Sequence, residues 1–265
     1  MKIIISPAKK MRVDTDTLEG RTLPEFIKET TEIMHWLQKL TYDEAKKLWE
    51  CNDGIASLNY KRLREMDLER NLTPAILSYE GIQYQYMAPA VFSDGELDYI
   101  QENLRILSGF YGVLKPMDGV VPYRLEMQAK AAVNGTESLY DFWAKRLYRA
   151  VLDESRIIIN LASREYAKII ERYLQPEDRF LTCIFGEMQS GRVVQKGTMA
   201  KMARGEMVRY MAENRVENPE QMKAFCGLGY CFSQELSTTE VYTFLKSEDK
   251  KAGSNQGGKK FETKK

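Results

Sequence analysis

The chain has 265 residues, of which 43% are hydrophobic and 29% charged, and this composition excludes disordered, collagen-like and disulfide-scaffold proteins. Basic residues number 39 and acidic residues 38, so net charge alone indicates no polyanionic partner. Residues 246–265 carry seven Lys against three acidic residues, which leaves the rest of the chain with a net charge of −3. A nucleic-acid surface on the folded part therefore requires basic residues that gather in a cleft or on one face.

The first half of the chain predicts helices around a few short strands. Thr41 with Glu44 and Ser93 with Glu96 have the form of capping boxes, in which each side chain bonds a free backbone N–H at the start of a helix. We expect a buried strand over residues 2–5, an amphipathic helix over 24–40, a helix from 41 to about 51, a helix from about 55 to 70, a strand over 75–79, and a helix from 93 that includes Leu104 and Leu107.

The second half predicts further alternation of helices and strands. We expect a long ordered or functional loop over 108–127, helices over 138–152, 163–173 and 198–214, strands over 156–161, 229–234 and 240–245, and a strand pair at 180–185 and 193–195. No glycine-rich phosphate motif occurs, so dinucleotide-binding and P-loop classes are unsupported. We predict an α+β single domain over 1–247 with a mixed sheet, followed by a disordered Lys-rich tail over 248–265.

The sequence also bears on compartment and cofactors. It contains no run of about 18 apolar residues that would span a membrane, and its N-terminal aliphatic run, residues 3–5, is too short for a signal peptide. We therefore expect a cytoplasmic protein whose four cysteines, Cys51, Cys183, Cys226 and Cys231, are reduced. Because His35 is the only histidine, the spacing predicts no metal site, and no motif predicts another cofactor.

A first polar cluster, residues 6–10, follows the first expected strand. Backbone N–H groups, the Ser6 hydroxyl and the Lys9 ammonium are all donors that suit an anion. The alternative is a strand end closed by a turn, with the lysines in solvent. The residues alone leave both interpretations open.

A second cluster, residues 122–127, follows the punctuated loop. Arg124 and Glu126 are two residues apart, so an extended backbone directs both to one side. Arg124 then suits a phosphate, with Glu126 holding the guanidinium in position. The alternative is a surface ion pair, which contributes little to stability.

A third cluster joins a strand to a helix. Asn160 and Ser163 offer neutral donors and acceptors beside a helix N-terminus, and Tyr166 follows one turn later. Ordinary helix capping explains Ser163 equally well.

The late helix carries two basic residues on one face. Lys201 and Arg204 are three residues apart, which places them side by side on a helix. Gly205 interrupts the same helix, and either close backbone packing or close approach of a ligand would explain it. No pattern supports a nucleophile with its base, so the motifs imply no reaction.

Several motifs together resemble the peroxide-stress protein YaaA family. They are ISPAK at 5–9, LSGFYGVL at 107–114, PYRLEM at 122–127, LYDFW at 139–143, INLAS at 159–163, ARG at 203–205 and ENR at 213–215. The similarity extends in order over residues 1–247, so only the basic tail lies outside it.

This resemblance implies a cytosolic bacterial protein that helps cells survive hydrogen peroxide, in part by limiting free iron and oxidative damage. It implies DNA binding by an α+β domain in which helices surround a rolled sheet beside a positively charged cleft. It also implies a helix-hairpin-helix element over about 42–63, with residues 53–56 as the hairpin.

The hairpin residues fit phosphate binding only in part. Gly54 suits a turn whose backbone N–H groups face an anion, and Lys61 and Arg62 follow on the next helix. Ala56 occupies a position where a second Gly is common, and Asp53 is acidic. The alternative is a helical hairpin with a purely architectural role.

Three functional hypotheses follow. The first is DNA binding without sequence specificity, with Lys9, Arg124, Lys201 and Arg204 in a basic cleft and Gly54, Lys61 and Arg62 nearby. The second is an enzyme acting on a nucleotide or nucleobase in a pocket that brings Ser6, Glu126, Asn160, Ser163 and Tyr166 together with Lys9 and Arg124. The third is direct iron sequestration, which ranks last because one histidine cannot form a two-histidine, one-carboxylate set.

Overall fold

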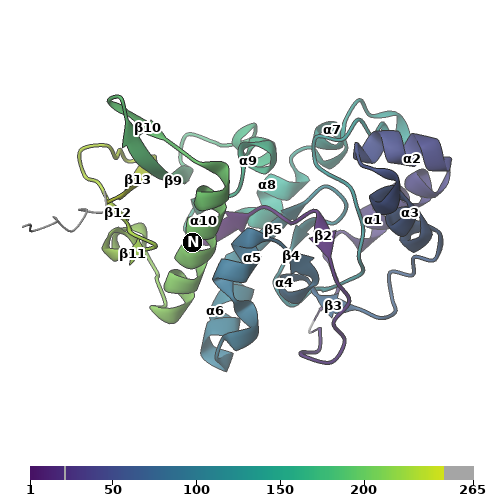
Figure 1. The fold of residues 1–265 in the computed structure, drawn as a ribbon, viewed down its shortest axis with the longest axis horizontal. Coiled ribbons are helices and arrows are strands. Elements are labelled where there is room, and N and C mark those ends of the chain that lie inside the picture. Colours follow the sequence, from purple (N-terminus) through teal and green to yellow (C-terminus); the bar gives the residue numbers. More distant parts are fainter. Residues whose placement is uncertain (21, 248–265) are drawn as a thin grey trace, which may run out of the picture.

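The computed structural model describes residues 1–20 and 22–247, so the Lys-rich tail expected at 248–265 lies outside the described residues (Figure 1). The strands are β1 (Lys2–Ile5), β2 (Lys10–Met11), β3 (Thr73–Pro74), β4 (Tyr79–Glu80), β5 (Leu104–Ser108), β6 (Gly112–Leu114), β7 (Gly119–Val120), β8 (Ile157–Leu161), β9 (Arg179–Gln189), β10 (Arg192–Val194), β11 (Cys226–Gly227), β12 (Tyr230–Phe232) and β13 (Val241–Lys246). The α-helices are α1 (Ile27–Gln38), α2 (Tyr42–Trp49), α3 (Asp53–Arg64), α4 (Ala75–Ser78), α5 (Ile82–Met87), α6 (Asp94–Asn103), α7 (Leu139–Trp143), α8 (Arg146–Val151), α9 (Arg164–Glu171) and α10 (Gly197–Glu213). Within the described ranges, no helix is both long enough and apolar enough to cross a membrane.

A mixed sheet of nine strands organises the fold. Its order is β11-β12-β13-β9-β8-β1-β5-β6, with β10 paired to β9. The five inner strands β13, β9, β8, β1 and β5 are parallel, whereas β6 and the β11–β12 pair add antiparallel edges. The expected mixed sheet is confirmed within a mixed α/β architecture, and this sheet is not a closed barrel.

Strand β1 lies inside the sheet because its sequence has no polar alternation. Ile3, Ile4 and Ile5 are all completely buried. A continuous aliphatic run is typical of a parallel strand that is covered on both faces. The first predicted strand is therefore confirmed, with β8 on one side of it and β5 on the other.

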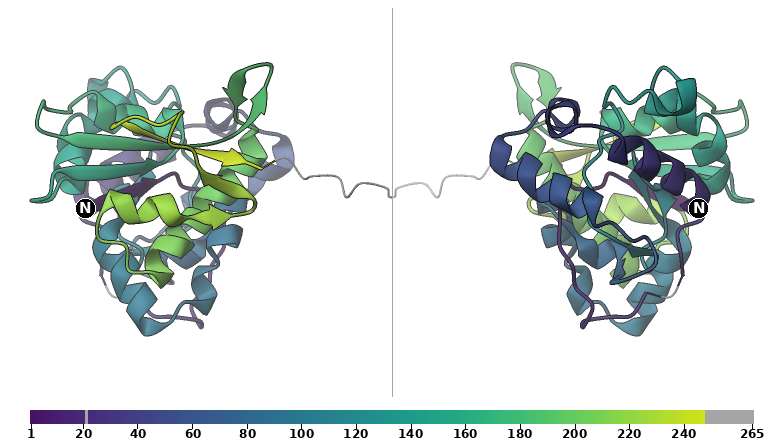
Figure 2. Two further views of the ribbon diagram at one scale, coloured as in Figure 1. Left: turned by 90° about the vertical axis from the view of Figure 1, so that its left-hand side faces the viewer. Right: turned by 90° about the vertical axis from the view of Figure 1, so that its right-hand side faces the viewer.

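The two ends of the molecule differ in construction. Helices α1, α2 and α3 gather at one end, and strands β10 to β13 form the other (Figure 1). The two side views in Figure 2 show these opposite ends in turn. Helix α10 lies along α5 between them (Figure 1).

Local capping signals fix two helix starts as predicted. Thr41 and Ser93 each accept a hydrogen bond from the backbone N–H three residues on, and Glu44 and Glu96 return bonds to the cap residues. Helices α2 and α6 begin directly after the cap residues Thr41 and Ser93. Capping depends on near neighbours in the chain, which explains why sequence alone finds it.

Two predicted elements have the wrong type. Residues 75–78 form helix α4 rather than a strand, since the Ala75 and Ile76 N–H groups bond the carbonyls of Asp118 and Pro116 instead of extending a ladder. Leu104 and Leu107 belong to strand β5, which ends the preceding helix at Asn103. A short buried apolar run has no distinguishing period, so tertiary pairing decides between helix and strand.

Two further regions are more divided than predicted. The helix expected over 138–152 is split into α7 and α8 at Ala144, whose φ is +45°. The long loop expected over 108–127 contains β6 and β7. Buried partners hold both regions, as when the Trp143 indole N–H donates to the Gly109 carbonyl at 2.9 Å.

The expectation that all four cysteines are reduced is wrong for one pair. Cys226 and Cys231 form a disulfide, whereas Cys51 and Cys183 are free. Strands β11 and β12 are antiparallel neighbours joined at Leu228 and Gly229, both with positive φ, and this hairpin sets the two Cα atoms 4.5 Å apart. The strand register brings the two sulfurs together. The prediction of reduced cysteines rested on the expected cytoplasmic location and did not take this pairing into account.

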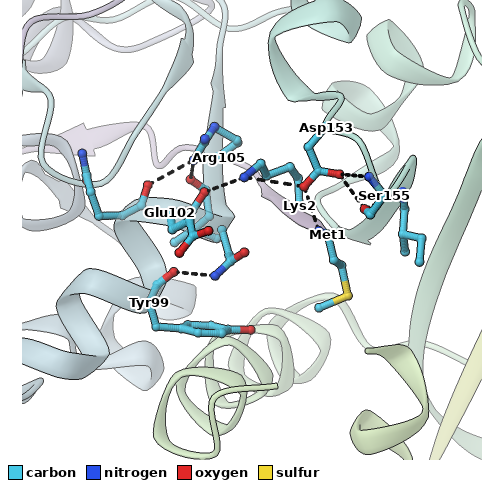
Figure 3. Close-up of polar contacts among 11 residues, drawn as sticks. Met1, Lys2, Tyr99, Glu102, Arg105, Asp153 and Ser155 are labelled. Atoms are coloured by element: carbon cyan, nitrogen blue, oxygen red, sulfur yellow. Dashed lines mark hydrogen bonds and ion pairs between the residues drawn. The ribbon is translucent and has the colours of Figure 1, made fainter. Parts of the chain in front are cut away.

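An ion-pair cluster holds the N-terminal end of β1 (Figure 3). The Asp153 carboxylate accepts from the Met1 ammonium at 2.7 Å and lies 3.6 Å from the Lys2 ammonium. Burial alone would raise the pKa of Asp153, but hydrogen bonds from the N-terminus and Ser155, with the charges of the N-terminus and Lys2, lower it to about 2. Asp153 therefore joins β1 to the segment before β8.

We predict that Gly205→Ala destabilises the fold, although Ala normally favours a helix. A Cβ at Gly205 would overlap the Gln83 carbonyl oxygen and lie 2.9 Å from the Met87 nitrogen, so α10 would have to move away from α5. Overpacking of this kind costs about 1–3 kcal/mol, measurable by urea denaturation. Gly197→Ala is the matched control, since nothing lies within 4 Å of its Cβ position, and equal stability of both variants would contradict the packing argument.

Thiol counting tests the cysteine pair. Denatured, unreduced protein should show two reactive thiols, from Cys51 and Cys183, and four after reduction. The Cys231→Ser variant should show three thiols with or without reductant. Four thiols in the unreduced wild type would contradict the pairing.

The Asp153 cluster predicts a pH-dependent contribution to stability. The folded-state pKa of about 2 lies below the ordinary 3.8, so the contribution is present above the unfolded value and disappears as pH falls through the folded value. Asp153→Asn should lower the free energy of unfolding at pH 7 by about 1–2 kcal/mol, allowing for partial exposure of the pair. The difference from wild type, measured by urea denaturation, should narrow from pH 4 toward pH 2. Asp16→Asn, at an exposed position, should show no such trend.

Candidate functional site

The candidate site lies where two neighbouring parallel strands end. Strand β1 ends at Ile5 and β8 at Leu161, and these two residues are paired in register. From β1 the chain moves to β5 on one side, and later to β8 on the other. In open parallel sheets, ligands bind at the carboxyl ends of strands where the chain changes direction in this way. The sheet order therefore marks the ends of β1 and β8 as a binding position.

Two serines join the loops that leave these strands. The Ser163 backbone N–H donates to Ser6 Oγ at 2.8 Å, and the Ser6 hydroxyl donates to Ser163 Oγ at 3.1 Å. The Tyr84 hydroxyl donates to the Ser6 carbonyl at 2.9 Å. Ser163 is the residue before α9, yet its side chain makes no capping bond. Its hydroxyl therefore serves the strand junction rather than the helix.

A cavity of about 450 Å³ opens at this junction. Eight of the residues singled out from the sequence line it: Ser6, Lys9, Arg124, Glu126, Ser163, Tyr166, Lys201 and Arg204. They come from the loop after β1, the segment after β7, the start of α9 and the middle of α10. The first three polar clusters and the basic face of α10 thus meet around one hollow.

Four other predicted residues lie elsewhere. Asn160 is buried within β8. Its amide donates to Thr182 Oγ1 and accepts from the Ala162 N–H, so it stabilises the end of the strand. Gly54, Lys61 and Arg62 lie on α3 and are not among the residues that line the cavity. Arg62 instead reaches the Met11 carbonyl.

Glu126 balances two of the cavity's cations. Its carboxylate lies 2.8 Å from the Lys9 ammonium and 3.7 Å from the Arg124 guanidinium. The Lys9 side chain is 66% exposed, whereas that of Arg124 is only 10% exposed. Arg124 also donates to the Trp49 carbonyl at 3.4 Å, but its buried Nε has no hydrogen-bond partner among the residues that the structure describes. Arg124 is therefore held by its tip and still has a donor to offer.

Arg204 is the cation with the least compensation. It has no ion pair and no hydrogen-bond partner among the residues that the structure describes, and its Nε is buried. Burial lowers the pKa of its guanidinium, and the neighbouring Cys183 thiol, whose own pKa burial raises to about 12, brings no negative charge at neutral pH. A desolvated cation without a carboxylate is costly. Its position at the cavity wall makes an anionic ligand the natural compensation.

Burial raises the pKa values of three tyrosines and one carboxyl group of the cavity. Burial raises the pKa of Tyr84 and of Tyr166, and it raises the pKa of Tyr123 to about 12. Burial also raises the pKa of Glu165, and the nearby Glu126 charge adds to the rise. The tyrosines therefore carry no charge at neutral pH, and the hydroxyls of Tyr84 and Tyr123 are already hydrogen-bonded within the protein.

Sequence reasoning missed the contribution of α5. Gln83 and Tyr84 line the cavity. Gln83 is 6% exposed, and within the described part of the chain its buried amide nitrogen has no hydrogen-bond partner. The segment carries no motif, and its place at the site depends on the close packing of α5 against Gly205. In the sequence, Gly205 was the residue that indicated a close approach to α10. The packing of α10 against α5 explains why glycine occupies this position.

A second cavity, of about 670 Å³, adjoins the first. Lys9, Arg124 and Glu126 belong to both linings. The second lining adds Lys47 of α2 and Lys130, together with the indoles of Trp36 and Trp49. The two hollows therefore lie next to each other, with Lys9, Arg124 and Glu126 between them, on the side of the molecule from α10 to α2. Within the described ranges, no group of three or more His, Cys, Asp or Glu is placed to hold a metal ion.

The hairpin expected at residues 53–56 lies at a different position. These residues form the first turn of α3, and the connection from α2 is Glu50, Cys51 and Asn52. Asn52 caps the helix by accepting from the Ile55 N–H at 3.0 Å. The Asp53 carboxylate is paired with Lys46 at 2.7 Å. The capping residue and this ion pair thus occupy the end of α3 that was expected to face a phosphate.

Comparison with known proteins gives a consistent result. Residues 1–236 match the family described as peroxide stress protein YaaA. A UPF0246 protein of Agathobacter rectalis is 57% identical over 244 residues, which covers 92% of this chain and 98% of that protein. A UPF0246 protein of Pediococcus pentosaceus is 52% identical over 248 residues, covering 94% of this chain and 99% of that protein. The resemblance found in the motifs is confirmed, and the chain belongs to the peroxide stress protein YaaA family.

Proposed function

We propose that the protein binds DNA without sequence specificity, through phosphate contacts along the two joined cavities. Lys9, Arg124, Lys201 and Arg204 would make these contacts, with Lys61 and Arg62 on α3 at a greater distance. Family membership supports a role in the peroxide-stress response. We further propose that the protein acts in the cytoplasm and helps to limit free iron and oxidative damage there.

Charge segregation is the observation that supports this proposal. Residues 1–245 carry a net charge of −3, yet the first cavity is lined by five basic and three acidic residues. The second cavity is lined by four basic and three acidic residues, among them Lys47 and Lys130 with Glu44 and Glu50. A local excess of positive charge in a cleft attracts a polyanion even when net charge does not. Contacts to phosphate alone carry no sequence information, which accounts for the lack of specificity.

Of the residues that the family resemblance implies for DNA binding, Gly54 has the least support from the structure. Asp53 and its partner Lys46 neutralise each other at the start of α3. The first turn of α3 already gives one N–H to Asn52. We therefore assign the main phosphate contacts to the cavity residues and treat Gly54 as an accessory position.

A salt series tests the proposal. On duplex DNA, log affinity falls against log salt with a slope of about 0.9 per neutralised phosphate, so Arg124→Ala and Arg204→Ala should each reduce the slope by about 1 on any sequence. Fluorescence anisotropy on duplexes of unrelated sequence measures both quantities. Arg149→Ala, an exposed position on α8 that lines neither cavity, is the matched control and should leave slope and affinity unchanged.

The Lys-rich tail requires its own comparison. Residues 248–265 carry six Lys, and such a segment binds DNA weakly by charge alone. The full chain and a chain ending at residue 247 should therefore both respond to Arg204→Ala. A slope that depends on the tail and not on Arg124 or Arg204 would contradict binding in the cavities.

A further inference from the structure

Buried donors without partners concentrate around the first cavity. Six buried side-chain polar atoms lack a hydrogen-bond partner among the described residues, and three of them, Gln83 Nε2, Arg124 Nε and Arg204 Nε, belong to residues that line this cavity. A fourth, Trp49 Nε1, belongs to the adjoining one. Most buried polar groups in proteins are satisfied, so such a cluster calls for a specific cause.

The chemistry of these atoms defines what would satisfy them. All three are N–H donors, and two are on guanidinium groups, so the missing partner is rich in acceptors and negatively charged. Arg124 already shares Glu126, but Arg204 has no carboxylate partner among the residues described. Guanidinium groups match phosphate oxygens in geometry as well as in charge. Lys201, one turn before Arg204, adds a second positive charge.

The cavity is larger than an inorganic anion requires. Its volume of about 450 Å³ lies within the range of about 300–1,000 Å³ found for small-molecule and cofactor sites. Tyr84, Tyr123 and Tyr166 supply aromatic surface, and aromatic side chains are the usual stacking partners of nucleobases. The Gln83 amide nitrogen has no acceptor among the described residues. It suits the hydrogen-bonding edge of a base, because glutamine side chains recognise base edges in other nucleic-acid complexes.

We propose that this cavity binds a single nucleotide, with its phosphate on Arg204 and Lys201 and its base near the Gln83 amide and the tyrosines. Two sources share this chemistry: a free nucleoside monophosphate and an unpaired nucleotide of a DNA strand. The second source rests on the proposed function, because it requires DNA to follow the path between the cavities. The first source is independent of it.

Titration calorimetry on the full chain tests the ligand class. The probes are the four deoxynucleoside 5′-monophosphates, the corresponding nucleosides and inorganic phosphate, all at one ionic strength. At least one monophosphate should bind more tightly than both its nucleoside and inorganic phosphate. If every monophosphate binds no better than inorganic phosphate, and a duplex with a central bubble binds no more tightly than a full duplex, the inference is overturned.

Two substitutions separate the phosphate and base contacts. Arg204→Met should weaken monophosphate binding by about 10- to 100-fold, the loss expected for a hydrogen bond to a charged group, and Arg204→Lys should retain part of the affinity. Gln83→Met should weaken monophosphate binding while leaving inorganic phosphate unchanged. Thermal melting without ligand establishes that each variant is folded, and Arg149→Ala is the control. Wild-type affinity in folded Arg204→Met and Gln83→Met would place the ligand elsewhere and overturn the inference.

Competition with DNA identifies the source. If unpaired DNA nucleotides enter the cavity, a duplex with a central bubble should displace a fluorescent monophosphate better than a full duplex, and Gln83→Met should remove that preference. If the ligand is a free nucleotide, bubble and duplex should compete equally. Duplex binding with no occupation by either source would overturn this inference alone, whereas nucleotide binding without any DNA binding would overturn the proposed function alone.

Discussion

The pairing of β1 with both β5 and β8 is the constraint on which the site depends. Three buried isoleucines hold this strand inside the sheet, and its parallel register with β8 brings the loops after Ile5 and Leu161 to one edge. The hydrogen bonds between Ser6 and Ser163 then connect segments that are 157 residues apart in the chain. The Asp153 cluster anchors the opposite end of the same strand. The central strand therefore fixes the positions of the loops that line the cavity.

Close packing of two helices completes the site from the other side. Because Gly205 has no side chain, α10 approaches the backbone of α5 at Gln83. Arg204 and Gln83 are thereby brought to one cavity, although neither is near the other in sequence. A glycine that weakens its own helix thus positions two donors.

Sequence reasoning succeeded where near neighbours determine structure and failed where distant partners do. The aliphatic run of β1 and the capping boxes at Thr41 and Ser93 carry local signals, and all three are confirmed. Residues 75–78 and 104–107 are short buried apolar runs, whose type depends on the strand or loop they meet. The same division holds for the site, since motifs marked the loops after β1 and β8 but nothing local marked α5. Asn160 belongs to the motif but not to the cavity lining, because its buried amide bonds Thr182 and the Ala162 N–H instead.

The cations of the cavity fall into two groups with different physical consequences. Lys9 and Lys201 are exposed, so their attraction for an anion acts at long range and is screened by salt. Arg124 and Arg204 are held in a desolvated wall, where a charge-assisted hydrogen bond is stronger than in water. Glu126 neutralises part of the wall that the two cavities share, whereas Arg204 has no carboxylate partner among the described residues. An anion attracted by the lysines would therefore make its strongest contact at Arg204, beside Gln83 and the tyrosines, rather than at the exposed lysines themselves.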